Sequence, residues 1–231
     1  MEHRDSAGHH AMVRPGELNL MTAGHGISHS EVSTASTSTL HGAQLWVALP
    51  SSARDVAPRF DHHAPAPVSG AGWEARVFLG SLLGSTSPVP TATPLLGAEL
   101  VLAAGAELDL DVDPAFEHGV LVDTGVVSVG DTEVTQHDLA YLPPGSQRLS
   151  LEAVTEARLL LLGGPPFGEA IVMWWNFVGR SHEEIVAFRD SWQEQLAGGG
   201  YADGRFGVPT GNDLPPIPAP ALPNARLRER R

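Results

Sequence analysis

The sequence predicts an all-β protein made of two copies of one β-module, followed by a single helix near the C-terminus. Three observations lead to this fold class: closely spaced short strand-like runs, an internal repeat, and one capped run of apolar residues at helical spacing. Hydrophobic residues make up 42% of the 231 residues and charged residues 18%, which excludes a disordered chain. This length leaves room for one large domain or two small ones.

Four runs carry the strand prediction. Residues 44–49 (QLWVAL) form a short apolar run suited to a strand in the core of a sandwich or barrel. Residues 108–112 alternate apolar and acidic side chains, which is the period of a half-buried strand. Residues 120–129 indicate two strands about the turn signal Asp123-Thr124-Gly125, and residues 158–162 form another apolar run. Many short strands at this spacing favour a sandwich or barrel.

An internal repeat suggests that the β-module occurs twice. Residues 13–24 can be laid on residues 134–145: each segment begins with Val, has an acid followed by Leu at its fifth and sixth positions, and ends in Gly. In the second copy strand-like sequence begins near Trp73, far upstream of Val134, whereas only twelve residues precede Val13. We therefore expect the N-terminal barrel to be incomplete. Its open strand edges could then pair with a second chain to form a dimer.

One helix is predicted over residues 182–197. Ser181 stands three residues before Glu184, the spacing of a capping box, and Gly198 ends the run. The apolar residues between them follow at helical spacing: Ile185, Phe188, Trp192 and Leu196. This stripe is interpreted as packing against the rest of the protein.

Proline-rich stretches mark the predicted boundaries. They divide the chain into an N-terminal module (1–50), a linker (51–72), a C-terminal barrel (73–197) and a tail (198–231). The tail carries too little apolar surface to form a core of its own, so we expect it to be mobile or laid over the surface as an extended strap.

Composition excludes several classes of site and partner. The chain has no Cys, so disulfides, thiolate metal sites and cysteine nucleophiles are excluded, and a metal must use His, Asp or Glu. The net charge of −13 argues against direct nucleic-acid binding. No apolar run approaches the ~20 residues that span a bilayer, and the polar N-terminus shows no signal peptide. We expect a cytoplasmic protein with no membrane partner.

The segment 22–31 (TAGHGISHSE) is the candidate site. Glycines on both sides of His25 indicate a tight turn or a close backbone approach. His29 and Glu31 are two positions apart, so on a strand both side chains lie on one face and can supply two metal ligands. Two further ligands on a neighbouring strand would complete a four-ligand site. The alternative is that both residues simply face solvent.

The other histidines lack this spacing. His9-His10 and His62-His63 are pairs of adjacent residues, so on a strand the two side chains of each pair would point to opposite faces. We expect His9-His10 in an exposed loop and His62-His63 in the linker. His41 could line the cavity, support a ligand, or be structural. His118 and His137 are isolated, so the second module is predicted to be metal-free.

Four segments resemble the pirin family: residues 2–8 (EHRDSAG), 15–31 (PGELNLMTAGHGISHSE), 41–47 (HGAQLWV) and 174–184 (WWNFVGRSHEE). The resemblance spans residues 2–49 and most of 73–192. It implies two cupin barrels (RmlC-like jelly rolls) in tandem. It also implies one divalent metal ion in the N-terminal barrel, and Fe(II) is the ion that the resemblance favours. The implied ligands are His29, Glu31 and a His-x-His pair that would fall before Met1.

The resemblance further implies chemistry related to quercetin 2,3-dioxygenase, in which O₂ opens a flavonol ring at the metal. The partner would be a small aromatic substrate, and Glu31 would also take the flavonol proton as general base. Two alternatives stay open. One is a non-enzymatic regulatory protein that binds other proteins according to the metal's oxidation state. The other is an inactive truncated form.

Overall fold

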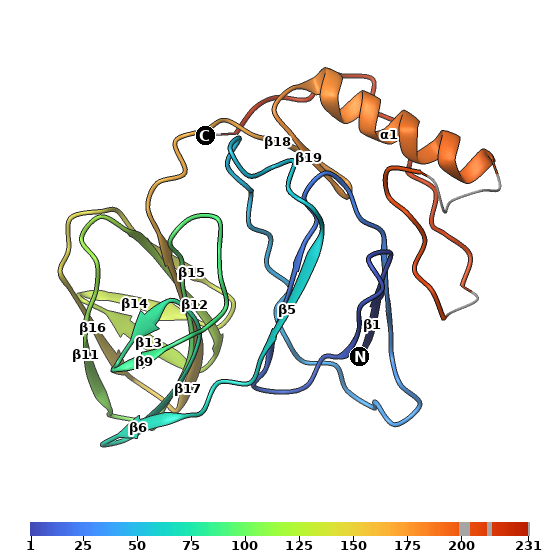
Figure 1. Ribbon diagram of the computed structural model, residues 1–231. Helices are drawn as coiled ribbons and strands as arrows, with labels where there is room; N and C mark the ends of the chain where they lie inside the picture. Colours follow the sequence, from blue (N-terminus) through green and yellow to red (C-terminus); the bar gives the residue numbers. More distant parts are fainter. Residues whose placement is uncertain (199–203, 212–213, 231) are drawn as a thin grey trace. The chain divides into compact units, whose positions relative to one another are not determined.

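The structure is a computed structural model that describes residues 1–198, 204–211 and 214–230. The chain divides into two compact units, which are treated separately below. One unit contains residues 61–167 together with 16–19, and the other contains residues 1–15, 20–60 and 168–231. Figure 1 shows the strands and the single helix of the described residues. Among those residues no helix has the length and apolarity needed to cross a membrane.

The unit that contains residues 61–167 is built mainly from two antiparallel sheets. The six-stranded sheet has the order β15-β12-β17-β10-β7-β6, with bounds Leu139–Leu142, Glu117–Thr124, Ala157–Gly164, Leu96–Leu102, Trp73–Leu79 and Val68–Gly70. The four-stranded sheet has the order β11-β16-β13-β14, with bounds Glu107–Asp111, Arg148–Ala153, Val126–Val129 and Thr132–Thr135. A short hairpin, β8 (Ser81–Leu82) and β9 (Ser85–Thr86), follows β7.

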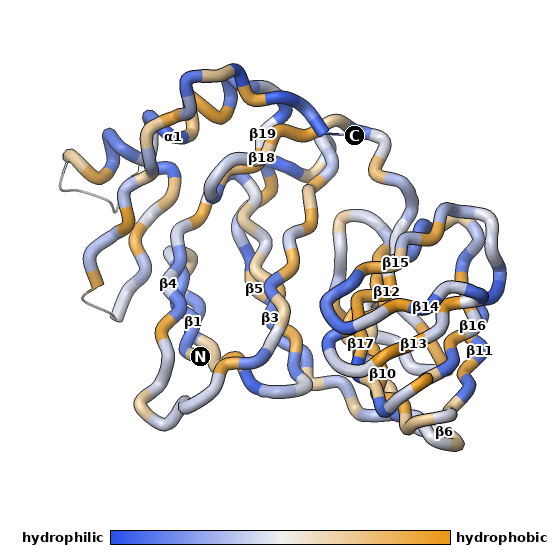
Figure 2. The backbone as a smooth tube through the Cα atoms, turned by 180° about the vertical axis from the view of Figure 1, so that it is seen from behind, coloured by the Kyte–Doolittle hydropathy of each residue, from blue (hydrophilic) through white to orange (hydrophobic). Residues whose placement is uncertain are grey.

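The core of this unit is apolar and comes from both sheets. Alternate residues of the longer strands are buried, and Leu100 and Leu159 of the larger sheet belong to the same cluster as Leu110 and Leu149 of the smaller one. Figure 2 shows orange, hydrophobic stretches along these strands. The predicted strands at 108–112, 120–129 and 158–162 are confirmed as β11, β12 with β13, and β17.

The turn between β12 and β13 requires glycine. Gly125 has φ +83°, and a Cβ atom there would lie 2.2 Å from the carbonyl oxygen of Glu156. Glycine is therefore needed in the turn predicted at residues 123–125 for two reasons: its positive φ, and the lack of space for a side chain beside Glu156.

The N-terminal strands have a different character. A three-stranded antiparallel sheet has the order β2-β1-β4, and β3 pairs with β5; their bounds are His10–Met12, Glu2–Asp5, His29–Val32, Leu18–Thr22 and Arg59–His63. Among residues 1–60, all of which are described, only His3 and Asp5 are buried. The interior side of this sheet is thus polar, and β2 and β4 are its edge strands.

The prediction of a core strand over residues 44–49 is wrong. The segment has no regular secondary structure, and Leu45, Trp46 and Val47 are each about half exposed. An apolar run becomes a core strand only when a neighbouring strand satisfies its backbone, and no described strand pairs with this one. The predicted linker, by contrast, contains two strands, β5 and β6.

The C-terminal part forms a second, smaller core. The hairpin of β18 (Val172–Trp174) and β19 (Phe177–Gly179) packs with the helix α1 (His182–Ala197), whose bounds agree with the prediction. Ser181 caps α1 by accepting a hydrogen bond from the backbone N–H of Glu184 at 3.2 Å. The buried cluster comprises Val172, Phe177, Ile185, Phe206 and Ala219.

Of the two expectations for the tail, mobile or laid over the surface as an extended strap, the described parts of the tail agree with the second. The indole N–H of Trp192 donates to the carbonyl of Ile217, and the guanidinium of Arg189 donates to the carbonyl of Pro220. These bonds join the tail to α1. Residues 199–203, 212–213 and 231, which the same expectation covered, lie outside the described residues.

Residues 168–231 group with residues 1–15 and 20–60 in one compact unit. Side-chain contacts within that unit explain the grouping. Arg54 makes two hydrogen bonds to the carboxylate of Glu184, at 2.9 and 3.1 Å. Arg180 donates to the carbonyl of Leu49 at 2.6 Å and to Glu169 at 2.9 Å. The segment around residues 49–54 is therefore attached to the start of α1.

Candidate metal centre

The antiparallel pairing of β1 with β4 assembles the candidate site. In this register His3 lies opposite Glu31, and Asp5 lies opposite His29. Residues directly opposite or two apart share one face of a sheet, so all four side chains lie on the same side. His29 and Glu31, the two residues predicted from sequence, are thus joined by two residues from the neighbouring strand.

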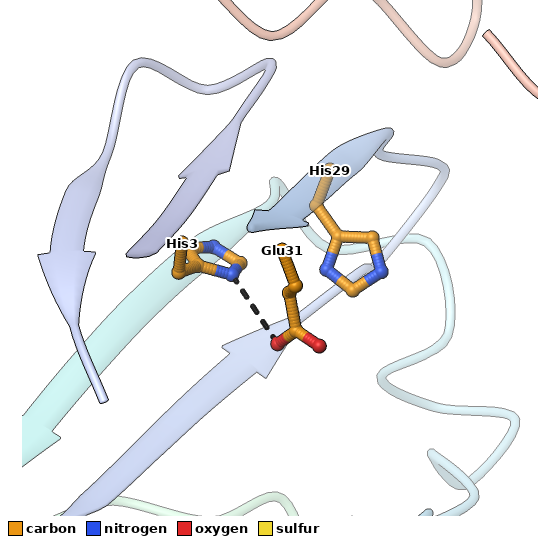
Figure 3. A group of neighbouring side chains, drawn as sticks. All are labelled: His3, His29 and Glu31. Atoms are coloured by element: carbon orange, nitrogen blue, oxygen red, sulfur yellow. Dashed lines mark ion pairs between the residues drawn. The ribbon is translucent and has the colours of Figure 1, made fainter. Parts of the chain in front are cut away.

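His3, His29 and Glu31 form a compact group of metal-ligating side chains. One potential ligand atom from each lies within 4.8 Å of the others. Figure 3 shows the carboxylate of Glu31 between the two imidazole rings, with His3 Nδ1 at 3.8 Å from Glu31 Oε1. The rings of His3 and His29 meet edge to face at 5.4 Å, and Phe60 stacks on His3 at 4.7 Å. Packing against Phe60 restricts the orientation of the His3 ring.

Asp5 stands behind His3, on the side away from Glu31. Its side chain is fully buried, and its Oδ2 lies 3.5 Å from His3 Nε2. Its Oδ1 accepts hydrogen bonds from the backbone N–H groups of Ala7 at 2.9 Å and His9 at 3.0 Å, and His9 Nδ1 lies 3.0 Å from Oδ2. The carboxylate is therefore held in place on the Nε2 side of the His3 ring, while Nδ1 of the same ring faces Glu31.

Burial among protein groups lowers the pKa of His29, and the nearby charge of Glu31 opposes this shift only in part. His29 is an exposed residue, and the lowered pKa favours its neutral imidazole at pH 7. A neutral imidazole is the form that binds a metal ion.

The turn before β4 contains the close approach predicted from its glycines. A Cβ atom on Gly24 would lie 2.0 Å from the carbonyl oxygen of Val56, and the backbone N–H of His25 donates to that same oxygen at 3.0 Å. Gly24 has φ +53°. Glycine here lets the chain pass Val56 and enter β4 with His29 at its first position.

The remaining histidines of the described residues do not belong to the group of three. The expectation of an exposed loop at His9-His10 is wrong for His10, which begins β2 because it pairs with Arg4 of β1. His62 and His63 lie on the strand β5, and His62 contacts Asn19 at 2.7 Å. His41 lies in an exposed irregular segment. Among the described residues, neither His118 nor His137 belongs to a cluster of three metal-ligating groups.

His3 is the residue that sequence reasoning missed. It alternates with Asp5 on one face of a short strand, which is the same spacing that singled out His29 and Glu31. Only the pairing of β1 with β4 shows that these two faces coincide. The signal available in the sequence was therefore the repeated His-x-acid spacing in two segments of one module.

The donor set fits a divalent metal ion. Two histidines and one carboxylate form the set found in mononuclear non-haem iron centres, and it also suits other divalent ions. Donors that share one ion at about 2.1 Å can lie at most about 4.2 Å apart, so a set within 4.8 Å needs only a small side-chain adjustment. The buried Nε2 of His3 has no hydrogen-bond partner within the usual distance, and Asp5 beside it is the orienting carboxylate that metal-binding histidines require.

Comparison with known proteins identifies the family to which the chain belongs. The family described as Pirin matches residues 1–47, and the Pirin C-terminal cupin domain matches residues 97–198. A candidate quercetin 2,3-dioxygenase of Pseudomonas aeruginosa is 44% identical over 222 residues, covering 96% of this chain and 68% of that protein.

Two solved structures are similar over most of the chain. A quercetin 2,3-dioxygenase from Acinetobacter baumannii has a TM-score of 0.87 and 36% identity, and covers 99% of this chain and 74% of its own. A bacterial pirin from Escherichia coli in complex with nickel(II) has a TM-score of 0.58 and 25% identity, with coverage of 71% and 68%.

The fold is thus that of an all-β tandem cupin protein with one C-terminal helix. Within that class, the chain belongs to the pirin family. Both the family resemblance and the fold class predicted from the sequence are confirmed.

Proposed function

We propose that this pirin-family chain binds one divalent metal ion through His29, Glu31 and His3, and oxidises small flavonol-like aromatic compounds. The observation that carries the proposal is the convergence of these three side chains from β1 and β4. The names of the similar proteins, which refer to quercetin 2,3-dioxygenase, support the substrate class. Fe(II) is the proposed ion, because the two-histidine, one-carboxylate set is the one used by non-haem iron oxygenases.

When bound, such an ion supplies Lewis-acid and redox chemistry toward O₂ and the substrate. The residues of this chain have separate roles. His3 and His29 hold the ion, and Asp5 keeps the proton of His3 on Nε2. Glu31, whose side chain is about one third exposed, is placed to accept the proton of a flavonol hydroxyl group.

Metal content and oxygen consumption test this proposal together. The purified chain, loaded anaerobically with Fe(II), is expected to hold close to one metal per chain and to consume O₂ when quercetin is added. His29→Ala should lose both properties, whereas His62→Ala, a change on β5 outside the group, should keep both. Full iron loading without turnover of quercetin would refute the substrate class, and no iron in the unaltered chain would refute the site.

A second function, protein binding that depends on the metal's oxidation state, is favoured by one observation. The exposed segment with Leu45, Trp46 and Val47 is an apolar surface of the kind that protein partners cover. Replacement of Trp46 by Ser should abolish co-purification of such a partner without changing iron content. A partner retained equally by both proteins in both iron oxidation states would exclude this function.

A further inference from the structure

The pairing of β1 with β4 is continued by two serines next to the candidate metal centre. The backbone N–H of Ser6 donates to the carbonyl of Ser28 at 2.9 Å, and the N–H of Ser28 donates to the side-chain oxygen of Ser6 at 3.1 Å. This pair directly follows the pair of Asp5 and His29. The hydroxyl group of Ser6 thus extends the pairing of the two strands beyond their last paired residues.

Both serine hydroxyl groups also bind the C-terminal segment 204–207. Oγ of Ser6 donates to the carbonyl of Phe206 at 2.6 Å, and Oγ of Ser28 donates to the carbonyl of Gly207 at 2.9 Å. Gly207 has φ +62°, and a Cβ atom there would lie 2.7 Å from Cβ of Ser6. The segment therefore lies directly against the chain at Ser6, and it is bonded to both strands that carry the proposed ligands.

Gln195 of α1 holds the same segment from the other side. Its side chain amide donates from Nε2 to the carbonyl of Gly207 at 3.1 Å, and its Oε1 accepts the backbone N–H of Phe206 at 3.2 Å. The residue is only 8% exposed, and a buried amide is costly unless it is hydrogen-bonded. Gln195 uses its oxygen and its nitrogen on two successive residues, so the segment is fixed to the helix.

The ligands need one particular register of β1 against β4. Hydrogen-bonded and non-hydrogen-bonded pairs alternate along an antiparallel ladder, and the bond from Ser6 to Ser28 marks a hydrogen-bonded pair. Three positions further along, His3 and Glu31 therefore form a non-hydrogen-bonded pair, in which side chains lie closer together. Both strands are polar and only four residues long, so on their own they specify this register weakly.

We propose that Ser6, Ser28 and Gln195 are positioning residues of the metal centre, which hold β1 and β4 in the register that assembles the proposed ligands. This inference rests on the proposed function, since it concerns the same centre. A continuous set of hydrogen bonds leads from α1, through the backbone of residues 206–207, to both ligand-carrying strands. The metal centre thereby depends on a helix that supplies none of its proposed ligands.

The test measures the affinity of the full chain for Ni²⁺ by competition with a chromophoric chelator. Ser6→Ala removes one bond to the segment and one bond between the strands, and it should lower the affinity about tenfold. Ser28→Ala should also weaken binding, whereas Ser28→Thr keeps the hydroxyl group and should bind Ni²⁺ as the unaltered chain does. The matched control is Ser87→Ala, which removes a bond to the backbone N–H of Val89 in the other compact unit and should leave the affinity unchanged.

Gln195→Met tests the connection to α1. It should weaken Ni²⁺ binding as Ser6→Ala does, and the two effects should not add in the double variant, because both changes break the same set of hydrogen bonds. Ni²⁺ affinity within about twofold of the unaltered chain in both single variants would overturn the inference.

Amide hydrogen exchange without metal gives a readout that does not need the proposed function. The amides of Arg4 and Ser30, the next hydrogen-bonded pair of the ladder, should exchange about tenfold faster in Ser6→Ala and in Gln195→Met, but not in Ser87→Ala. Unchanged exchange in both variants would overturn the inference. An unaltered chain that binds no Ni²⁺ would instead refute the proposed metal centre, and the exchange rates would then still decide whether these residues hold the register.

Discussion

Replacing Asp5 by asparagine tests how the metal centre is held. In the structure Oδ1 of Asp5 accepts hydrogen bonds from two backbone N–H groups, those of Ala7 and His9, while Oδ2 faces His3 Nε2. An asparagine must keep its oxygen toward the two N–H donors, because an NH₂ group there would meet only other donors. The NH₂ group then occupies the place of Oδ2 and points at His3.

This exchange reverses the proton preference of His3. A donor facing Nε2 favours the tautomer with the proton on Nδ1, and Nδ1 is the nitrogen that faces Glu31 and the proposed ion. Metal binding then requires a change of tautomer and the loss of a hydrogen bond. We expect affinity to fall about 10- to 100-fold, equivalent to about 1.4 to 2.7 kcal/mol.

Competition with a chromophoric chelator measures this affinity directly, with Ni²⁺ or Fe²⁺ as the ion. Asp131→Asn, an exposed aspartate in the turn between β13 and β14, is the matched control and should leave the affinity unchanged. Circular dichroism must show that Asp5→Asn remains folded. A folded Asp5→Asn protein with affinity within about twofold of the unaltered chain would refute the orienting role of Asp5.

Three further predictions concern stability. Arg54 lowers the pKa of Glu184 from its ordinary value of 4.5, so the stability lost in Glu184→Gln should be largest above that pH and should vanish as pH falls through the lowered pKa. Urea unfolding from about pH 7 to about pH 3 checks this, and a stability difference that does not depend on pH would contradict it. Leu161→Ala should cost about 2 to 5 kcal/mol by urea unfolding, against less than about 0.5 kcal/mol for the exposed Leu139→Ala; similar costs at both sites would contradict the burial argument. Ser181→Ala should cost about 1 kcal/mol by removing the cap of α1, and an unchanged unfolding midpoint would show that the cap does not stabilise the protein.

The strands of the C-terminal barrel could be predicted because each carries its own signal. In β11, for example, Leu108 and Leu110 are buried while Asp109 and Asp111 between them are exposed, so the alternation in sequence equals the alternation in burial. The helix α1 was predictable for the same reason, since its cap and its apolar spacing are both local. The apolar run at 44–49 has a similar local signal, but no strand among the described residues hydrogen-bonds to its backbone, and the sequence alone does not show whether such a strand is present.

Only half of the candidate site could be predicted from the sequence. His29 and Glu31 lie on one strand, so their shared face follows from their spacing alone. His3 and Asp5 join them through the register of β1 against β4, which depends on pairing across a gap in the sequence. A shift of one residue would turn His3 to the opposite face, and nothing in the sequence of these four-residue strands distinguishes the two registers.

The contrast between the two modules indicates where each keeps its function. The C-terminal barrel buries mainly Leu, Val and Ala, so most changes to its interior reduce the free energy of unfolding. Residues 1–60 bury only His3 and Asp5, and burying a histidine and a carboxylate stabilises nothing unless they bind each other or a ligand. Asp5 is satisfied by Ala7 and His9, while His3 Nε2 lies 3.5 Å from Asp5 and Nδ1 lies 3.8 Å from Glu31, both beyond hydrogen-bond distance. His3 is therefore buried without a hydrogen bond to either carboxylate, and its Nδ1 faces the group that the proposed metal ion would share.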